Sequence, residues 1–354
     1  MRRTGVSTRP GRGPRGGGVR WLALGALAVL ALSAFDVAVP YAGFHHPVVV
    51  EIPEHSNRWS IAERLAGAGV VRSAVVFTAW ALVHPGVTLK AGAYRFARAH
   101  SLPAVFHRLA QGRIFAYSFV VPEGFDRFEI ARQLSRGHIA SGAAFLAVTA
   151  NPALARRLDP EAVSLEGYLF PATYSIAPGT SARAIAATMV GRFRQALPHA
   201  GWRPGLRDPH GQAISFHEWL TVASLVEKET ALPSERAVIA GVFYNRLDGH
   251  LPLQSDPTVI YADEIAGRPG GPLTTADLHF VSPYNTYTHV GLPPGPIANP
   301  GLAAMRAASH PAATPYLYFV SNGHGGHRFA RTLAGQDRNV RLYLRVLAAN
   351  KGGR

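Results

Sequence analysis

The sequence of 354 residues contains no cysteine. Disulfide bonds and thiolate metal sites are therefore excluded, so neither stabilises the fold nor supplies the chemistry. This absence is compatible with a bacterial envelope protein and with a bacterial cytosolic protein, and it does not distinguish between them.

Several motifs of known chemistry are also missing. The chain has no Walker loop and no G-x-S-x-G motif. The pairs His45/His46 and His324/His327 lack carboxylates at metal-ligand spacing, so we expect no metal and no cofactor. No nucleic-acid-binding module is recognisable, and we expect no nucleic-acid partner.

Acidic residues are scarce relative to basic ones, and the formal net charge is +15. Residues 1–20 contain six arginines and no acid, so about +9 remains on the rest of the chain after these six are removed. A basic body suits an anionic partner such as nucleic acid, phospholipid or an acidic envelope polymer, although an arginine-rich proteome would give the same charge.

The chain has one long apolar run. Residues Trp21–Phe35 carry no charge, and the segment continues to Phe44 with only Asp36 charged. Because arginines precede it, we predict a disordered cytoplasmic tail over 1–20 and a single-pass inner-membrane anchor over 21–44, with the body in the periplasm. Cleavage as a signal peptide near Ala31–Ser33 is the alternative.

A small unit is predicted from residue 47 to about residue 115. The pattern indicates a strand at Val48–Ile52, a helix with Ser60 as its N-cap, a helix over Ser73–Val83 and a strand over Leu89–Phe96. A short helix follows from Ser101. This strand-helix-helix-strand order resembles the LysM-like module that binds the glycan backbone of peptidoglycan, although many small α+β units share it.

The second predicted domain covers residues 116–354. Helices are predicted over 182–197, 217–230, 234–246 and 339–349, between loops rich in proline and glycine. The strands are short and scattered, as at Leu317–Val320. The fold class predicted for the whole chain is therefore α+β, not a doubly wound sheet.

The segment LTVASLVEKETA, residues 220–231, places two acids in an apolar helix. On a helical wheel, Glu227 and Glu229 border the buried arc on opposite sides of the helix. Burial raises the pKa of a carboxyl group, which suits a general acid. One acid could face a cleft while the other is paired internally, with Arg236 or Arg246 for example. The alternative is that both acids are buried ion-pair partners, and the wheel does not say which glutamate is functional.

Three loops, over residues 253–262, 282–301 and 321–333, are dense in Asn, Gln, Thr, Tyr and Pro. Aromatic faces and neutral hydrogen-bonding groups suit a sugar ligand. Ordinary structural loops have a similar composition.

Five segments together resemble the YceG-like family of endolytic murein transglycosylases, which are membrane-anchored terminases of peptidoglycan strand growth. They are LEGYLFPATY, ASLVEKET, SERAVIAGVFYNRL, LQSDPTVIYA and SPYNTYTHVGLPPGPIANPG. The resemblance implies that Glu227 is the catalytic residue and that loop residues line or shape the glycan cleft. These residues are Gln254, Asp256, Tyr284, Asn285, Thr286 and Tyr287. The sequence departs from the family pattern at Ala172 and at Gln336-Asp337, so contacts at these positions are not carried over.

The resemblance further implies cleavage of the bond between N-acetylmuramic acid and N-acetylglucosamine, with 1,6-anhydro ends as products. The expected partners are peptidoglycan glycan strands, the cytoplasmic membrane and peptidoglycan synthases. Two alternatives remain. A two-carboxylate hydrolase would need Asp256 as its second acid, and a non-catalytic glycan-binding scaffold would need neither acid to be free.

Overall fold

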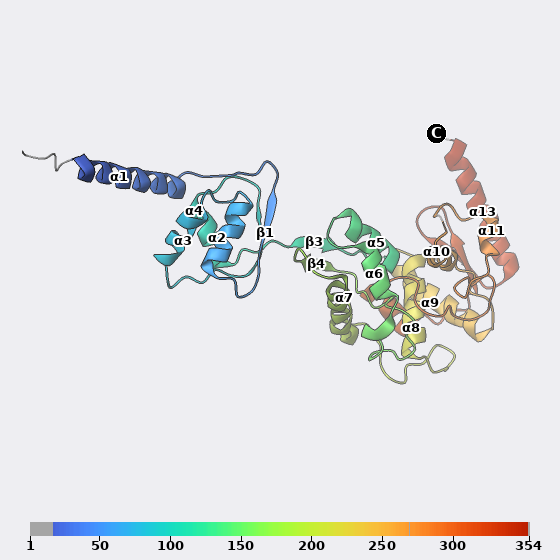
Figure 1. Ribbon diagram of the computed structural model, residues 1–354. Coiled ribbons are helices and arrows are strands. Elements are labelled where there is room, and N and C mark those ends of the chain that lie inside the picture. The colour runs from blue at the N-terminus through green and yellow to red at the C-terminus, as the bar shows by residue number, and fades with distance from the viewer. Residues whose placement is uncertain (1–16, 269, 353–354) are drawn as a thin grey trace, which may run out of the picture. The chain divides into compact units, whose positions relative to one another are not determined.

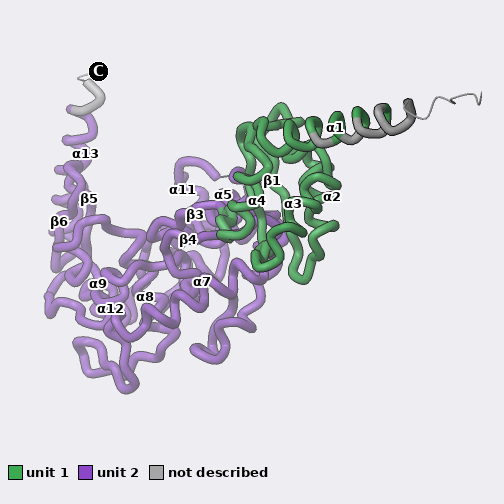
Figure 2. The backbone as a smooth tube through the Cα atoms, turned by 90° about the vertical axis from the view of Figure 1, so that its left-hand side faces the viewer, with its two compact units in different colours: residues 1–116 green, residues 117–354 purple. Residues whose placement is uncertain are grey.

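The computed structural model describes residues 17–268 and 270–352, as drawn in Figure 1. The chain divides into two compact units, Met1–Ala116 and Tyr117–Arg354, which Figure 2 shows in green and purple. In the described residues, the strands form three antiparallel sheets of two strands each, and the other elements are helices. The predicted α+β class is confirmed.

The N-terminal helix α1 covers Gly17–Ala38. Residues 1–16 of the predicted tail lie outside the described residues, and residues 17–20 belong to this helix. The helix ends just before Pro40, which disfavours a helical conformation at the preceding residue. In the part of the chain that the structure describes, no helix is both long enough and apolar enough to cross a membrane.

The segment that follows α1 is not helical, although it lies within the predicted span 21–44. The N–H of Tyr41 donates to the carbonyl of His100 at 3.0 Å, and the N–H of Gly43 donates to the carbonyl of Gly69 at 2.8 Å. The guanidinium of Arg72 lies over the Tyr41 ring at 4.8 Å. Backbone pairing therefore ties this segment to the first unit.

The first unit has its own apolar core. Strands β1 (Val48–Ile52) and β2 (Gly92–Phe96) pair antiparallel. Helices α2 (Arg58–Gly67) and α3 (Ala74–Leu82) lie between the two strands in sequence, and α4 (Leu102–Gln111) follows β2. The order of strands and helices is the predicted one. The predicted N-cap of α2 was wrong, because the Asn57 side chain accepts the hydrogen bond from the N–H of Ser60, at 2.8 Å.

The second unit contains the remaining helices and strands. Its elements are β3 (Tyr117–Val120), α5 (Arg127–Arg136), α6 (Gly142–Thr149), a 3₁₀ turn at Pro152–Leu154, β4 (Thr173–Ile176), α7 (Ala182–Ala196), a 3₁₀ turn at Leu197–His199, α8 (Phe216–Glu229), α9 (Pro233–Asp248), α10 (Asp256–Ile265), α11 (Thr275–Leu278), α12 (Leu302–Ser309), β5 (Tyr318–Ser321), β6 (His327–Ala330) and α13 (Leu333–Gly352). The four predicted helices are present, but α13 begins at Leu333 instead of Asn339 because a stretch rich in polar residues hides its first turns.

Helix α8 is the central helix of this unit. A capping box at Ser215 and Glu218 starts it, and every residue from Trp219 to Val226 is buried. The helix packs against α12, α9 and α10. The indole N–H of Trp219 donates to the hydroxyl of Ser309 at 2.8 Å, which fixes α8 to α12. The acids of the last turn of α8 are therefore held on a rigid element.

Candidate active site

Glu227 lies half-buried in the last turn of α8. Its Oε2 accepts a hydrogen bond of 2.9 Å from the backbone N–H of Gly301, the N-cap residue of α12. Burial raises the pKa of Glu227, and the nearby charge of Glu123 acts in the same direction. The hydrogen bond from Gly301 and the charges of Arg236 and Lys228 oppose this shift without reversing it. The protonated form that a general acid requires is therefore favoured.

The structure adds a second acid that the sequence analysis did not identify. Glu123 follows β3 in the segment Pro122–Gly124, and its carboxylate lies against Gly301. A Cβ atom at position 301 would lie 2.0 Å from Oε1 of Glu123, so only glycine fits there with Glu123 in this place. The carboxylates of Glu123 and Glu227 thus meet at one residue, Gly301.

Gly124 forms part of the wall around Glu227. It has φ of +78°, a left-handed conformation that favours glycine, and an added Cβ would lie 3.5 Å from Cγ of Glu227. Its N–H donates to the carbonyl of Asn299 at 3.0 Å, and the Lys228 ammonium donates to its carbonyl at 3.2 Å. These bonds hold the loop after β3 against the end of α8.

Two buried polar side chains, Asn299 and Glu166, stabilise the loop after β3. The amide of Asn299 donates to Glu166 Oε1 at 2.7 Å and to the carbonyl of Phe125 at 2.8 Å, and it accepts from the N–H of Leu169 at 2.8 Å. Glu166 also accepts from the N–H of Arg127 at 2.9 Å. Burial raises the pKa of Glu166 to about 8. Both side chains are buried among protein groups, so their role is structural.

Glu229 has different surroundings from Glu227. Its Oε1 accepts a hydrogen bond from the Ser255 hydroxyl, and burial raises its pKa to about 7. It lines a pocket of about 490 Å³ that also contains side chains of the predicted site and several aromatic rings. The residues that line this pocket include Arg246, Gln254, Asp256, Tyr287, Tyr318 and His327.

Three of the predicted site residues meet in this Glu229 pocket. Arg246 Nη2 donates to Oε1 of Gln254 at 2.6 Å, and the hydroxyl of Tyr287 donates to Asp256 at 2.6 Å. Arg246 otherwise binds the carbonyls of Pro252 and Leu317 and makes no ion pair with either glutamate among the described residues. The alternative that Arg246 is an ion-pair partner was therefore wrong.

The other three predicted site residues shape the loop instead of facing the pocket. Asn285 and Thr286 are fully buried. The amide of Asn285 donates to the carbonyl of Phe280 at 2.7 Å, and the hydroxyl of Thr286 accepts from the N–H of Ser255 at 3.0 Å. Tyr284 packs edge-on against Tyr261, with ring centroids 5.1 Å apart.

The two departures from the family pattern have different surroundings. The carbonyl of Ala172 accepts from the N–H of Val121 at 2.9 Å, next to the pairing of β3 with β4. Gln336 donates from Nε2 to the carbonyl of Phe319 at 2.9 Å and lines the Glu229 pocket. In the described residues, no group of three or more histidine, aspartate or glutamate side chains could hold a metal ion.

A half-buried acid with a raised pKa, fixed at the end of a buried helix by a backbone N–H, defines the class of acid–base enzyme sites. Comparison with known proteins identifies the family. The model of the YceG-like family matches residues 50–342 of this chain. The chain therefore belongs to the YceG-like family.

Named relatives agree with this assignment. The chain is 33% identical over 313 residues to the endolytic murein transglycosylase of Bacillus subtilis, with 84% of this chain and 85% of the relative covered. It is 32% identical over 328 residues to the protein of the same name from Streptococcus pneumoniae D39, with 83% of this chain and 58% of that longer relative covered. A crystal structure of a protein described as yceG-like, from Listeria monocytogenes, superposes with a TM-score of 0.53 at 32% identity and covers 83% of this chain and 99% of that one.

Proposed function

We propose that this protein is an endolytic lytic transglycosylase that cleaves nascent peptidoglycan strands and thereby terminates their elongation. The observation that carries the proposal is the carboxyl group of Glu227, whose pKa is raised chiefly by burial and which is oriented by the Gly301 N–H. Relatives that match most of this chain are named endolytic murein transglycosylases, which supports the substrate and the reaction.

The proposed reaction uses one carboxyl group twice. Protonated Glu227 donates its proton to the glycosidic oxygen between N-acetylmuramic acid and N-acetylglucosamine, and that bond breaks. The resulting carboxylate then accepts the proton of the muramic 6-hydroxyl as this oxygen attacks its own anomeric carbon. The product is a 1,6-anhydro ring, Glu227 is protonated again and no water is consumed. A glycosidase that hydrolyses its substrate would need a second carboxylate as base or nucleophile.

We further propose that the Glu229 pocket binds the glycan. Gln254, Asp256 and Tyr287 present polar and aromatic groups to this space, which suits sugar hydroxyl and acetamido groups. Tyr284, Asn285 and Thr286 contribute by holding the loop in place. Glu229 is then a binding and structural residue, and Glu227 is the catalytic residue.

The mass of the glycan ends tests the reaction. Purified sacculi are digested with the full-length protein in detergent, and new muramic ends are measured by mass spectrometry. We expect anhydro ends, each lighter by one water than a reducing end. Reducing ends as the main product would instead indicate a hydrolase. Binding to sacculi without any new ends would indicate a scaffold.

We propose that the apolar segment over residues 21–44 anchors the protein in the inner membrane, with the body in the periplasm. The arginines before it and its exposed apolar side chains, among them Trp21, Leu27 and Leu32, support this arrangement. Protease added to spheroplasts should degrade the body and spare a tag at the N-terminus. A released body that begins near Ser33 would instead indicate a cleaved signal peptide.

We also propose that residues 47–115 form a LysM-like glycan-binding module and that peptidoglycan synthases are partners of the protein. The strand-helix-helix-strand order and the separate core of the first unit support the module. Deletion of the module should weaken binding to sacculi and leave cleavage of short soluble glycans unchanged. Loss of folding in the remaining chain would refute the assignment of a separate module.

A further inference from the structure

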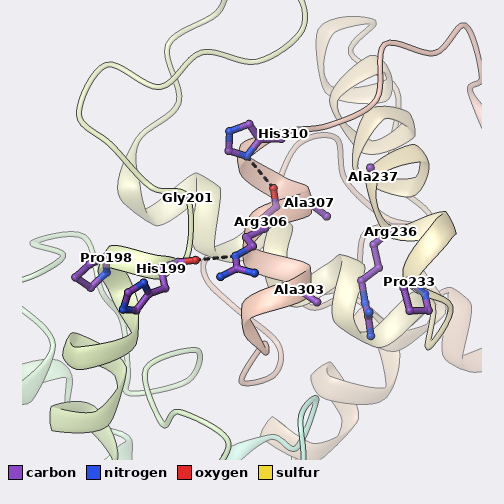
Figure 3. Close-up of a pocket in the computed structure, with 10 residues that line it drawn as sticks. All are labelled: Pro198, His199, Gly201, Pro233, Arg236, Ala237, Ala303, Arg306, Ala307 and His310. Carbon is purple, nitrogen blue, oxygen red and sulfur yellow. Dashed lines mark hydrogen bonds between the residues drawn. The ribbon is translucent and has the colours of Figure 1, made fainter.

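A second pocket in the catalytic unit is strongly basic. It has a volume of about 460 Å³ and lies where the turn before Gly201, the start of α9 and one face of α12 meet, as Figure 3 shows. Four of the ten described residues that line it are basic and none is acidic: the basic residues are His199, Arg236, Arg306 and His310. We refer to it as the basic pocket.

Arg236 lies between the basic pocket and the catalytic acid. Its side chain lines the pocket, and its positive charge also acts on Glu227. The Nε atom of Arg236 is buried and has no hydrogen-bond partner among the described residues. A buried donor without a partner is uncommon in folded proteins.

Arg306 lies on α12, on the other side of the basic pocket. Its Nε donates to the carbonyl of His199 at 2.8 Å, as the dashed line in Figure 3 shows. This bond fixes the guanidinium group, while its terminal nitrogens remain able to donate. The ring of His310 is held by a bond of 3.3 Å between Nδ1 and the carbonyl of Arg306. The side chains of Arg306 and His310 are therefore partly preorganised.

The pocket borders the catalytic site through α12. This helix begins at Leu302, directly after Gly301, and its residues Ala303, Arg306 and Ala307 line the pocket. A ligand group in the basic pocket would thus belong to the same substrate molecule whose bond lies at Glu227. Glycan hydroxyl and acetamido groups are neutral, whereas the peptide stems carried by muramoyl residues bear carboxylates.

We propose that the basic pocket binds a carboxylate of the acidic peptide stem on a muramoyl residue next to the cleaved bond. The inference rests on the proposed transglycosylase function and specifies which part of the substrate is recognised. A guanidinium group pairs with a carboxylate through two parallel N–H donors, and burial of such a pair is favourable only if the acceptor satisfies those donors. The protein is thus selective for glycan strands that still carry their stems.

Two substrates and three variants test the inference. Glycan strands with stems are compared with the same strands after an amidase has removed the stems. Arg306→Gln should raise KM about 10-fold on strands with stems, as expected for a lost charge-assisted hydrogen bond, and should leave stem-free strands unaffected. Arg306→Lys keeps the positive charge but loses the two parallel N–H donors of the guanidinium group, so it should show a smaller increase in KM. Arg156→Gln removes an equal charge from an exposed position outside the pocket and should change the KM for neither substrate.

Other outcomes would overturn the inference. Arg306→Gln could change KM equally for both substrates, or for neither substrate at an unchanged melting temperature. Either result would show that the pocket does not bind the peptide stem. Inorganic phosphate that competes at a lower concentration than a free muramoyl-peptide would assign the pocket to a phosphate group instead.

Failure of the proposed function gives a different result. The wild type would then produce no anhydro ends from either substrate. Binding of a muramoyl-peptide to Glu227→Gln, measured by calorimetry with and without Arg306→Gln, tests the pocket even in that case. A loss of binding in the double variant would support the inference, and equal binding would overturn it.

Discussion

The backbone N–H of Gly301 donates to the carboxylate of Glu227 across 74 residues of sequence, at 2.9 Å. This bond joins the end of α8 to the start of α12 and fixes the direction of the acid. Because it stabilises the charged form, it opposes the rise in pKa that burial causes. Glu227 is therefore held in place while its pKa stays above the ordinary value.

Replacement of the catalytic acid is the first prediction. Glu227→Gln keeps the size of the side chain and removes its proton, so turnover should fall by about 10²–10⁴-fold. The loss should lie at the upper end of this range because one group acts in both half-reactions. The release of anhydro ends from sacculi, at an unchanged melting temperature, is the measurement.

Two matched variants serve as controls for this experiment. Glu229→Gln and Asp256→Asn should reduce turnover less than Glu227→Gln, because these side chains are proposed to bind substrate and not to transfer protons. If Asp256→Asn were as damaging as Glu227→Gln, the single-carboxylate mechanism would be wrong.

The second prediction concerns Glu123 and pH. Its negative charge contributes to the raised pKa of Glu227, so Glu123→Gln should lower that pKa. Activity requires protonated Glu227 and is lost as pH rises through its pKa, so the alkaline limb of the pH–rate profile should move to lower pH. Glu161→Gln, at an exposed position, should leave the profile unchanged. A profile that does not move in Glu123→Gln would contradict the role of Glu123.

Gly301→Ala provides a third, independent prediction. The backbone at Gly301, with φ of −78° and ψ of 171°, is accessible to alanine. The new methyl group would lie 2.0 Å from Oε1 and 2.8 Å from Cγ of Glu123, so the Glu123 side chain must rotate away. The variant should therefore show the same movement of the alkaline limb as Glu123→Gln. The double variant should move it no further than either single one, and full additivity would disprove the contact.

The fourth prediction concerns the support behind the site. Asn299→Ala removes three hydrogen bonds and takes this partner from Glu166 Oε1 and from the N–H of Leu169, whereas the carbonyl of Phe125 keeps its bond of 3.0 Å from the backbone N–H of residue 299. Each unpaired buried group costs about 1–3 kcal/mol, so the free energy of unfolding should fall by about 2 kcal/mol or more. Urea denaturation measures it. Asn339→Ala, which loses one bond of 3.4 Å, should change stability much less.

Much of the fold could be predicted because it depends on local periodicity. Helices α8 and α9 begin and end within two residues of their predicted bounds. The wheel also placed Glu227 and Glu229 at opposite borders of the buried arc, and the two side chains do have different partners in the structure. Local pattern was sufficient for both results.

The geometry of the site could not be predicted in the same way. The contacts of Gly301 with Glu123 and Glu227 join segments far apart in sequence, and no periodic pattern encodes them. The polar composition of the loops also did not show which of their residues face a ligand. The side chains of Asn285 and Thr286 hydrogen-bond to the backbone within the protein, because loop carbonyl and N–H groups need partners when they are buried. A polar loop residue can thus hold the loop without facing a ligand.

The last prediction uses the raised pKa of Glu229. Its value of about 7 in the folded protein lies above the ordinary 4.5, so the folded state binds more protons than the unfolded state between these limits. The contribution of this group to stability is fully present below about pH 4.5 and is lost as pH rises through about 7. In Glu229→Gln, where nothing titrates and Ser255 keeps an acceptor, that loss should disappear.

Urea denaturation of the full-length protein in detergent, from about pH 4.5 to about pH 8, measures the difference between the wild type and Glu229→Gln. The wild type should lose stability relative to the variant as pH rises. Glu166 and Asp126, whose pKa values burial raises to about 8 and about 6, titrate in both proteins and cancel in the difference. Two parallel stability curves would show that Glu229 titrates near its ordinary value and is not desolvated in the folded protein.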